Sequence, residues 1–232
     1  RAEYGLLRWL LDDIAGDPAL QLQIVATGMH LSTEFGLTYR AIEADGFTID
    51  EKVHMLIASD EPSAVAKSVG LGVIGFADAL TRLNPDVVVL LGDRFELLAA
   101  AQAAMLLRLP IAHLHGGEAS EGAVDESIRH AITKMSSLHF VAAEAYRRRV
   151  IQMGEEPSRV FHLGTPGLDV LLRKELADRA TIEQDVGISL RSPSFLVTHH
   201  PATLGDRSAT TSLAALLSAL DRLPDANVLV TR

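Results

Sequence analysis

The chain has 232 residues, of which 48% are hydrophobic and 22% are charged, and it contains no cysteine. This balance is ordinary for a globular protein, and the missing thiols exclude disulfides and thiolate metal sites. A formal net charge of −9 provides no broad positive field, so nucleic acid is not an expected partner. Because no run approaches about 18 apolar residues, we expect a soluble, cytoplasmic protein without a membrane partner.

Short apolar runs alternate along the chain with longer amphipathic stretches. The runs typical of strands are Leu22–Thr27, His54–Ala58, Val87–Leu91, Ile111–His115, Leu138–Ala142, Val160–Leu163, Phe195–Thr198 and Asn227–Val230. The stretches typical of helices are Ala64–Leu83, Glu96–Arg108, Asp125–Ser136, Glu144–Met153 and Ser212–Leu220. Several strand runs are continuous Val, Ile and Leu, as in parallel strands buried on both faces. The alternation predicts an α/β fold with a parallel sheet and crossover helices.

The same alternation suggests how the chain is divided into domains. Residues 1–170 read as one α/β domain, residues 171–193 as a charged and then turn-rich connection, and residues 194–232 as the start of a second α/β unit. Two strands are too few for an independent parallel-sheet domain. Arg1 opens directly into a helix-like stretch, so we expect a first strand and most of the second domain to be missing.

Acids and histidines gather where several of the expected strands end. The segments that follow three of the strands are Gly92-Asp93-Arg94-Phe95-Glu96, then Gly116-Gly117-Glu118 with a helix from Asp125, and His199-His200-Pro201. Ligands of doubly wound sheets collect at the carboxyl ends of the strands. The pattern therefore predicts a site, without naming its reaction.

Structural explanations of these residues remain open from sequence alone. Asp93 could cap the helix that begins near Arg94. Asp125 could form an i,i+4 ion pair with Arg129 and serve only the helix.

Two patterns suggest a cofactor, and both are weak. His113, His115 and Glu118 could offer metal ligands, but they lack a metal-site spacing. The run Gly70–Gly75 fits the dinucleotide pattern GxGxxG, but it follows helical residues instead of a strand. We expect these glycines to permit close helix packing, and we expect no metal and no redox cofactor.

An ordered set of motifs extends over nearly the whole chain. The set comprises Arg1–Leu7, Gly28–Ser32, Lys67-Ser68 with Gly70–Gly72, Gly92–Glu96, His113–Glu118, Asp125–Ser136, Gly164 with Gly167–Asp169, and His200-Pro201. Together these motifs resemble the hydrolysing UDP-N-acetylglucosamine 2-epimerases of the sialic and legionaminic acid pathways. The resemblance implies two Rossmann-like domains of the GT-B type with a site between them, and a homodimer formed through the helices Glu96–Arg108 or Asp125–Ser136.

The resemblance also implies a reaction and roles for individual residues. Members of the family invert C2 of the sugar and release UDP by elimination to a 2-acetamidoglucal and hydration of its double bond. The residues expected to be catalytic are Asp93, Glu118, Asp125 and His200. The residues expected to bind the substrate are Arg1, Arg94, His115, Glu126, Arg129, His130 and His199.

The sequence departs from the family pattern at His115, where the sialic acid branch carries a catalytic glutamate. Either Glu118 replaces that glutamate, or His115 itself handles a proton. UDP-N-acetylglucosamine is the first choice of substrate, and a UDP-2,4-diacetamido-2,4,6-trideoxy sugar is the alternative. A non-hydrolysing 2-epimerase and a catalytically silent sugar-nucleotide-binding protein are the competing functions.

Overall fold

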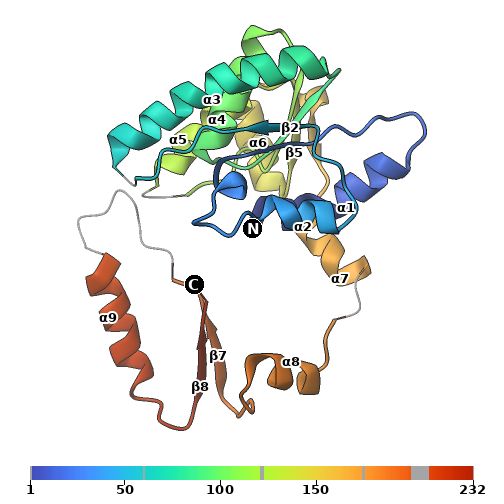
Figure 1. Ribbon diagram of the computed structural model, residues 1–232. Helices are drawn as coiled ribbons and strands as arrows, with labels where there is room; N and C mark the ends of the chain where they lie inside the picture. The colour runs from blue at the N-terminus through green and yellow to red at the C-terminus, as the bar shows by residue number, and fades with distance from the viewer. Residues whose placement is uncertain (1, 60, 121–122, 174–175, 200–208, 232) are drawn as a thin grey trace. The chain divides into compact units, whose positions relative to one another are not determined.

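The chain forms two compact units in the computed structural model, which describes residues 2–59, 61–120, 123–173, 176–199 and 209–231 (Figure 1). The first unit consists of residues 1–120 and 125–172, and the second of residues 121–124 and 173–232. Every strand pairing in the described residues is parallel. The α/β architecture expected from the sequence is therefore present in both units.

The first unit contains two separate parallel sheets. Its strands are β1 (Val25–Thr27), β2 (Glu51–Val53), β3 (Val88–Leu91), β4 (Ile111–Leu114), β5 (Leu138–Val141) and β6 (Val160–His162). Its helices are α1 (Ala2–Gly16), η1 (Gly28–Leu31), α2 (Tyr39–Ala44), α3 (Pro62–Leu83), α4 (Phe95–Leu106), α5 (Val124–Met135), α6 (Glu144–Gln152), η2 (Pro157–Arg159), η3 (Pro166–Leu168) and α7 (Asp169–Arg173). One sheet has the order β3-β4-β5-β6, and the other is the pair β1-β2. The carboxyl ends of β3 to β6 therefore share one edge.

The core of the first unit lies between the larger sheet and the helices α3 and α4. All four residues of β4 are buried, as expected for a continuous apolar strand covered on both faces. Five alanines of α4 are buried, which lets this helix pack closely against α3, seen alongside it in Figure 1. An interior helix of this kind is apolar on most sides. Only its end, with Leu106 71% exposed, presents apolar surface to the outside.

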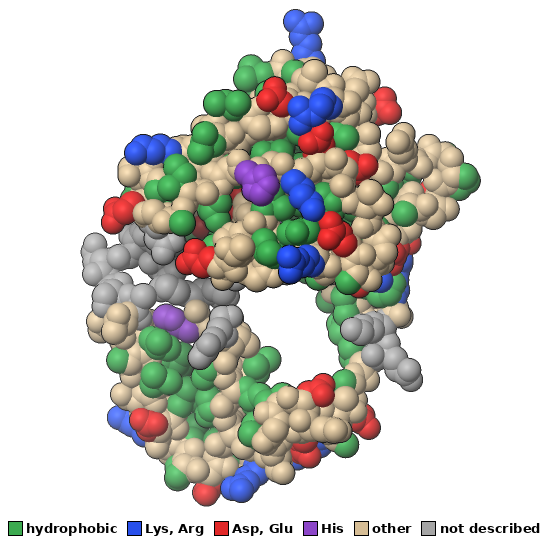
Figure 2. Space-filling view, in the orientation of Figure 1, with side chains coloured by type: hydrophobic (Ala, Val, Ile, Leu, Met, Phe, Trp, Pro, Cys, Tyr) green, Lys and Arg blue, Asp and Glu red, His purple; other side chains and the backbone are tan. Residues whose placement is uncertain are grey.

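The described residues of the second unit form one strand pair and two helices. Its elements are α8 (Arg179–Val186), β7 (Ser194–Val197), α9 (Ala209–Leu220) and β8 (Asn227–Val230). Helix α8 begins at Asp178, whose side chain accepts a hydrogen bond from the Thr181 amide at 2.8 Å, and it ends at Gly187 with φ of 74°. Leu196 of β7 is 75% exposed. Figure 2 shows apolar side chains gathered on the viewed face of the second unit.

The second strand of the chain lies earlier than the sequence predicted. The apolar run His54–Ala58 was the expected strand, but β2 is Glu51–Val53. Strand β1 ends at Thr27, the partner of Val53, because Gly28, with φ of 56°, turns the chain into η1. The residues after Val53 therefore have no neighbouring strand with which to pair. The buried side chain of Met55 packs into the core without belonging to a ladder.

Helix α3 is long and apolar enough to span a membrane, although the sequence has no long uninterrupted run of apolar residues. It has 22 residues with a mean hydropathy of 1.4 in its most apolar window, and 33% of that window is buried. This is weak evidence for a span, because core helices meet the same test, and α3 packs against α4 and β2. The glycine run lies inside this helix, as predicted.

Glycines on one face of α3 allow neighbouring elements to approach closely. A Cβ added at Gly72 would lie 2.8 Å from the Cβ of Ala99 and 2.7 Å from Cε of Met55, whereas one added at Gly70 would meet nothing within 4 Å. The helix therefore packs through Gly72 and leaves Gly70 free of such contacts.

We expect Gly72→Ala to lower the free energy of unfolding by about 1–3 kcal/mol, because the new methyl group overpacks the contact with α4. Gly70→Ala is the matched control and should stabilise the protein by up to about 1 kcal/mol through helix propensity alone. Urea unfolding of the two variants measures both effects. Equal effects of the two substitutions would show that close packing at Gly72 is not required.

Candidate active site

Acidic and basic side chains gather at the carboxyl edge of the larger sheet. Asp93 follows β3, His115 and Glu118 follow β4, and Arg129 extends from α5, which begins beyond the same edge. The loop after β4 turns at Gly117, with φ of 77°, where a Cβ would lie 2.6 Å from the carbonyl oxygen of Tyr146. Only glycine fits there, so the loop brings Glu118 back toward the sheet.

A buried guanidinium lies at the centre of this cluster. Arg129 is 7% exposed and forms an ion pair with Asp93. It also donates to the Ser120 hydroxyl at 3.1 Å, and its Nη1 lies 4.0 Å from a carboxylate oxygen of Glu118. The Nε and Nη1 atoms of Arg129 are buried and have no hydrogen-bond partner among the described residues. Arg129 therefore contacts two carboxylates and still has N–H donors without a hydrogen-bond partner among the described residues.

The observed contacts do not match a helix-capping role for Asp93 or an ion pair between Asp125 and Arg129. The residue that caps α4 is Arg94, and it makes no side-chain capping bond, while the Asp93 carboxylate is directed to Arg129. Among the described residues, Arg129 forms its ion pair with Asp93 and not with Asp125. Asp125 nevertheless lies close enough for its charge to act on Asp93.

The environment displaces the pKa values of the two carboxyls in opposite directions. Burial raises the pKa of Asp93; the charge of and hydrogen bond from Arg129 oppose this, and the charges of Asp125 and Glu118 add to the rise. Burial by itself would raise the pKa of Glu118, but the hydrogen bond and charge of His115, with help from Arg129, bring it below its ordinary value. A cluster of this kind can hold one carboxyl protonated beside another that is ionised.

His115 connects the loop after β4 to the end of β6. Its Nδ1 lies 2.6 Å from Glu118 Oε1, and its Nε2 lies 3.0 Å from the Thr165 hydroxyl. The backbone of His115 has φ of 64°, a left-handed conformation that is uncommon for residues other than glycine. Thr165 also receives a weak hydrogen bond from the Gly167 amide at 3.4 Å. The imidazole is therefore fixed on both sides.

His113, on β4, is buried in the core and contacts residues next to the site. It is 0% exposed; Nε2 lies 2.8 Å from the Gly92 carbonyl oxygen, and Nδ1 lies 3.1 Å from the Thr133 hydroxyl. Burial lowers the pKa of His113 to about 4, so the ring is neutral and donates one proton to Gly92. Both ring nitrogens are occupied, so His113 does not offer a metal ligand. No group of three metal-binding side chains occurs in the described ranges.

The first turn of α5 fixes the loop that precedes it. Glu126 accepts a hydrogen bond from the Ser120 amide at 2.9 Å, and its other oxygen lies 3.9 Å from Nε2 of His130. The Nδ1 of His130 is buried without a hydrogen-bond partner among the described residues. Glu126 and His130 therefore support the cluster beside Arg129.

A second charged group lies where β1 and β3 end. Arg94 lies 3.5 Å from a carboxylate oxygen of Glu3 and 3.4 Å from one of Glu96. His30 lies nearby, where the Thr38 hydroxyl is 2.8 Å from its Nδ1 and burial lowers its pKa. Arg94 is one-third exposed, so its guanidinium can still reach an anionic ligand.

The remaining predicted site residues belong to the second unit or are not among the described residues. His199 belongs to the second unit, where its Nε2 lies 3.1 Å from the Ser212 hydroxyl. Arg1 and His200 are not among the residues that the structure describes.

Sequence reasoning did not identify three hydroxyl residues of the site. Thr165 holds His115, Ser120 holds Arg129, and Thr133 holds His113. Thr165 follows β6, whose carboxyl end shares the edge with β3 and β4, so its position after a strand was the available signal. Ser120 and Thr133 carry no such signal, because serine and threonine are common in loops and on helices.

A parallel sheet with acids gathered at its carboxyl edge is the arrangement of an α/β ligand-binding domain of the Rossmann type. Residues 12–232 match the profile of a family described as UDP-N-acetylglucosamine 2-epimerase. The chain belongs to this family, as its motifs predicted.

Relatives and solved structures agree with this assignment. The chain is 43% identical over its whole length to the GDP/UDP-N,N'-diacetylbacillosamine 2-epimerase (hydrolyzing) of Campylobacter jejuni, and it spans 60% of that protein. It is 39% identical over 95% of its length to the polysialic acid biosynthesis protein P7 of Escherichia coli, of which it spans 56%. The UDP-GlcNAc 2-epimerase of Neisseria meningitidis bound to UDP-GlcNAc superposes on 99% of the chain, with a TM-score of 0.84 and 16% identity, and the match covers 63% of that structure. This likeness confirms the expected α/β fold of the GT-B type.

The buried imidazole of His113 predicts a pH dependence of stability. In the unfolded chain the ring takes up a proton below about pH 6.5, whereas the folded ring stays neutral down to about pH 4. The free energy of unfolding should therefore fall by about 3 kcal/mol as the pH drops from 6.5 to 4. His113→Gln keeps an amide donor for Gly92 but cannot titrate, so its decline over this interval should be shallower. If urea unfolding showed the same decline of the free energy of unfolding with falling pH in both proteins, His113 would not be its source.

Proposed function

We propose that the protein is a hydrolysing 2-epimerase of a UDP-sugar, which releases UDP and the free C2 epimer. The observation that supports this most directly is the pair Asp93 and Glu118, gathered around one buried arginine with pKa values displaced in opposite directions. Inversion at C2 needs a group that removes a proton and a group that delivers one. The Campylobacter relative at 43% identity is named a hydrolyzing 2-epimerase, which is consistent with this chemistry.

The proposed reaction has two halves. In the first, a base removes the proton from C2 while the bond from C1 to the UDP oxygen breaks, which leaves UDP and a 2-acetamidoglucal. In the second, water adds its hydroxyl to C1 and a proton returns to C2 on the other face. The sum is hydrolysis of the sugar–phosphate bond with inversion at C2.

We assign the proton transfers among the clustered acids. Glu118, with its lowered pKa and its contact with His115, is the ionised group that accepts the C2 proton. Asp93, with its raised pKa, is a proton donor, and Asp125 is the third acid, available to the second half of the reaction. The free donors of Arg129 stabilise negative charge as it develops. Arg94, with Arg1, is proposed to contact the nucleotide phosphates, and His199 and His200 to act from the second unit.

The preferred substrate is a UDP-2,4-diacetamido-2,4,6-trideoxy sugar. His115 replaces the glutamate of the sialic acid branch, and the Campylobacter relative is named for N,N'-diacetylbacillosamine, a sugar of this class. UDP-N-acetylglucosamine, the first choice from sequence, becomes the second candidate. We further propose that the enzyme is cytoplasmic, needs no metal or redox cofactor and works as a homodimer, with the end of α4 and the exposed face of α5 as contact surfaces.

The intact protein tests the function in deuterium oxide with both UDP-sugars. We expect free UDP, the free epimer of the sugar and one deuterium at C2. Inverted sugar that is still joined to UDP would identify a non-hydrolysing epimerase. Binding of UDP without turnover of either substrate would identify a silent binding protein and overturn the proposal.

Asp93→Asn should lower kcat by at least about 100-fold, because the amide cannot deliver a proton. Asp185→Asn, at an exposed position of α8, is the matched control and should keep full activity. Thermal melting of both variants shows whether the fall in kcat reflects the missing proton donor or a fold destabilised by loss of the ion pair with Arg129. Activity of Asp93→Asn within a few-fold of the parent enzyme would exclude Asp93 as a proton donor.

Thr165 is proposed as a positioning residue for His115. Its hydroxyl can donate to Nε2 of a neutral ring and accept from Nε2 of a charged one, so His115 keeps a partner in both states. Thr165→Val should lower kcat about tenfold with little change in KM, and Thr165→Ser should restore it. A valine variant that retains kcat, or a serine variant as impaired as valine, would contradict this role.

A further inference from the structure

Three consecutive arginines on α6 have three different environments. The side chain of Arg148 is 79% exposed, and its Nε lies 3.4 Å from a carboxylate oxygen on the same helix. Arg147 donates from Nε to the carbonyl oxygen of Val160 at 3.2 Å. Arg149 is half-buried and donates from Nη1 to the carbonyl oxygen of Gly117. Of the three, Arg149 is therefore the one that contacts the loop after β4.

This loop carries Glu118 on two glycines. The last backbone hydrogen bond of β4 joins the His115 amide to the carbonyl oxygen of Phe140 at 2.9 Å. Within the part of the chain that the structure describes, the contact from Arg149 is the only hydrogen bond to the backbone of residues 116–118. Glycine backbones have the widest choice of conformations. A loop of this composition therefore depends on an anchor from outside it.

The anchored oxygen belongs to the peptide group that leads directly into Glu118. Because a peptide bond is planar, a contact that fixes the Gly117 carbonyl also fixes the Glu118 amide and the Cα atom beyond it. The donor is a cation, and hydrogen bonds from ionised donors are stronger than those from neutral ones. Arg149 therefore sets the direction in which the Glu118 side chain leaves the backbone.

Helix α6 provides a firm base for this contact. Val150, next to Arg149, is 0% exposed and packs with Val141 and Val160. The guanidinium of Arg149 lies 5.9 Å from the ring centroid of Tyr146, within the range of a cation–π contact. The helix is thus held to the sheet by its buried side, and the guanidinium is held by a ring of the same helix.

The direction of the Glu118 side chain decides which groups its carboxylate meets. One oxygen lies 2.6 Å from Nδ1 of His115, and the other lies 4.0 Å from Nη1 of Arg129. Burial favours the neutral carboxyl, but the hydrogen bond and charge of His115, with the charge of Arg129, lower the pKa of Glu118. A rotation of the Gly117 peptide would carry the carboxylate away from both groups.

We propose that Arg149 is a positioning residue that holds the Glu118 carboxylate in place for its reaction, through the Gly117 peptide and without contact with the substrate. The role rests on the proposed function, in which Glu118 accepts the C2 proton. A misplacement of about 1 Å can lower the rate of an enzyme about 100-fold. The contact therefore acts on the chemical step and not on the binding of the nucleotide.

Arg149→Met tests this role in the intact protein, because methionine keeps an unbranched side chain and removes the donors. We expect kcat to fall about 10- to 100-fold, with KM within about twofold of the parent value. Glu118 must be ionised to accept a proton, so activity falls below its pKa. The acid limb of the pH profile of kcat should therefore move to higher pH, because a carboxylate that leaves His115 loses the contact that lowers its pKa.

Arg148→Met is the matched control on the same helix. It removes an exposed arginine whose ion pair contributes little, so kcat, KM and the pH profile should all stay at the parent values. Thermal melting shows whether the variants fold. If Arg149→Met does not fold, Arg149→Lys takes its place, because it keeps a charged donor on a shorter side chain, and we expect a smaller loss of kcat with the same direction of shift.

The pKa of the Glu118 carboxyl, followed by carbon NMR without substrate, gives a readout that does not depend on turnover. It should rise in Arg149→Met and stay unchanged in Arg148→Met. Equal kcat values and equal acid limbs in these two variants would overturn the proposal. A lower kcat with an unchanged pKa of Glu118 would also overturn it, because Arg149 would then serve the fold alone. If the parent protein turned over neither UDP-sugar while the pKa still rose, the proposed function would fail and the positioning contact would stand.

Discussion

The arrangement of the candidate site depends on one buried cation, the guanidinium of Arg129. It has a carboxylate from the end of β3 on one side and one from the loop after β4 on the other, while α5 supplies its backbone. A buried charge of this kind is tolerated only when opposite charges and hydrogen bonds compensate it. Removing either carboxylate therefore disturbs the other, because both share the same partner. The site therefore behaves as a unit and not as two independent acids.

The core beneath the site restricts how far this unit can move. His113 connects the Gly92 carbonyl, directly before Asp93, to Thr133 on α5, one turn after Arg129. The two partners of the central ion pair are thus linked twice, once through their charges and once through a neutral buried imidazole. This second link gives a buried histidine a direct role in holding the two proposed catalytic partners together. Pre-organised groups of this kind do not have to rearrange as charge develops.

Several features of the fold and site followed from the sequence for clear physical reasons. Buried parallel strands are continuous apolar runs, so β3, β4 and β5 were found nearly in place, and their shared carboxyl edge predicted that Asp93 and Glu118 would approach. The partner of Asp93 was not predictable, because local spacing offered Arg129 to Asp125, and only the tertiary fold brings it to Asp93. The strand near residue 54 was misplaced because hydrophobicity marks burial, whereas a strand also requires a neighbour.

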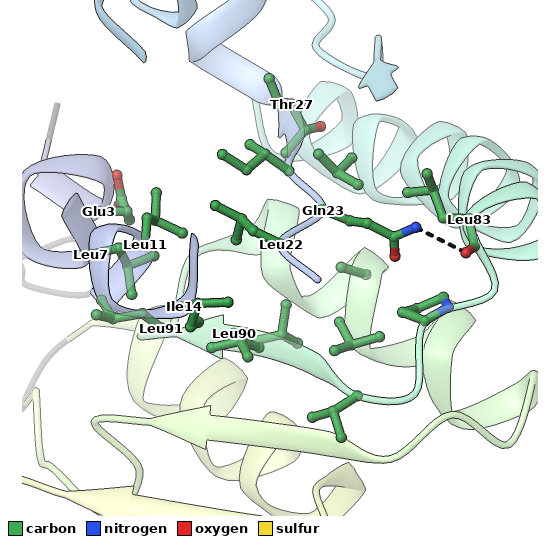
Figure 3. Close-up of a pocket in the computed structure, with 18 of the residues that line it drawn as sticks. Glu3, Leu7, Leu11, Ile14, Leu22, Gln23, Thr27, Leu83, Leu90 and Leu91 are labelled. Carbon is green, nitrogen blue, oxygen red and sulfur yellow. Dashed lines mark hydrogen bonds between the residues drawn. The ribbon is translucent and has the colours of Figure 1, made fainter. Parts of the chain in front are cut away.

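The spacing of His30 and Arg94 depends on how the two sheets of the first unit pack against each other. His30 follows β1 and Arg94 follows β3, and an apolar gap of about 560 Å³ lies between these strands (Figure 3). Two sheets that share no ladder are held together only by side-chain packing, which allows small relative shifts. The distance between His30 and Arg94 therefore depends on how the side chains between β1 and β3 pack. Because a misplacement of about 1 Å can cost an enzyme 100-fold in rate, this packing and the geometry of the proposed phosphate contact are one requirement.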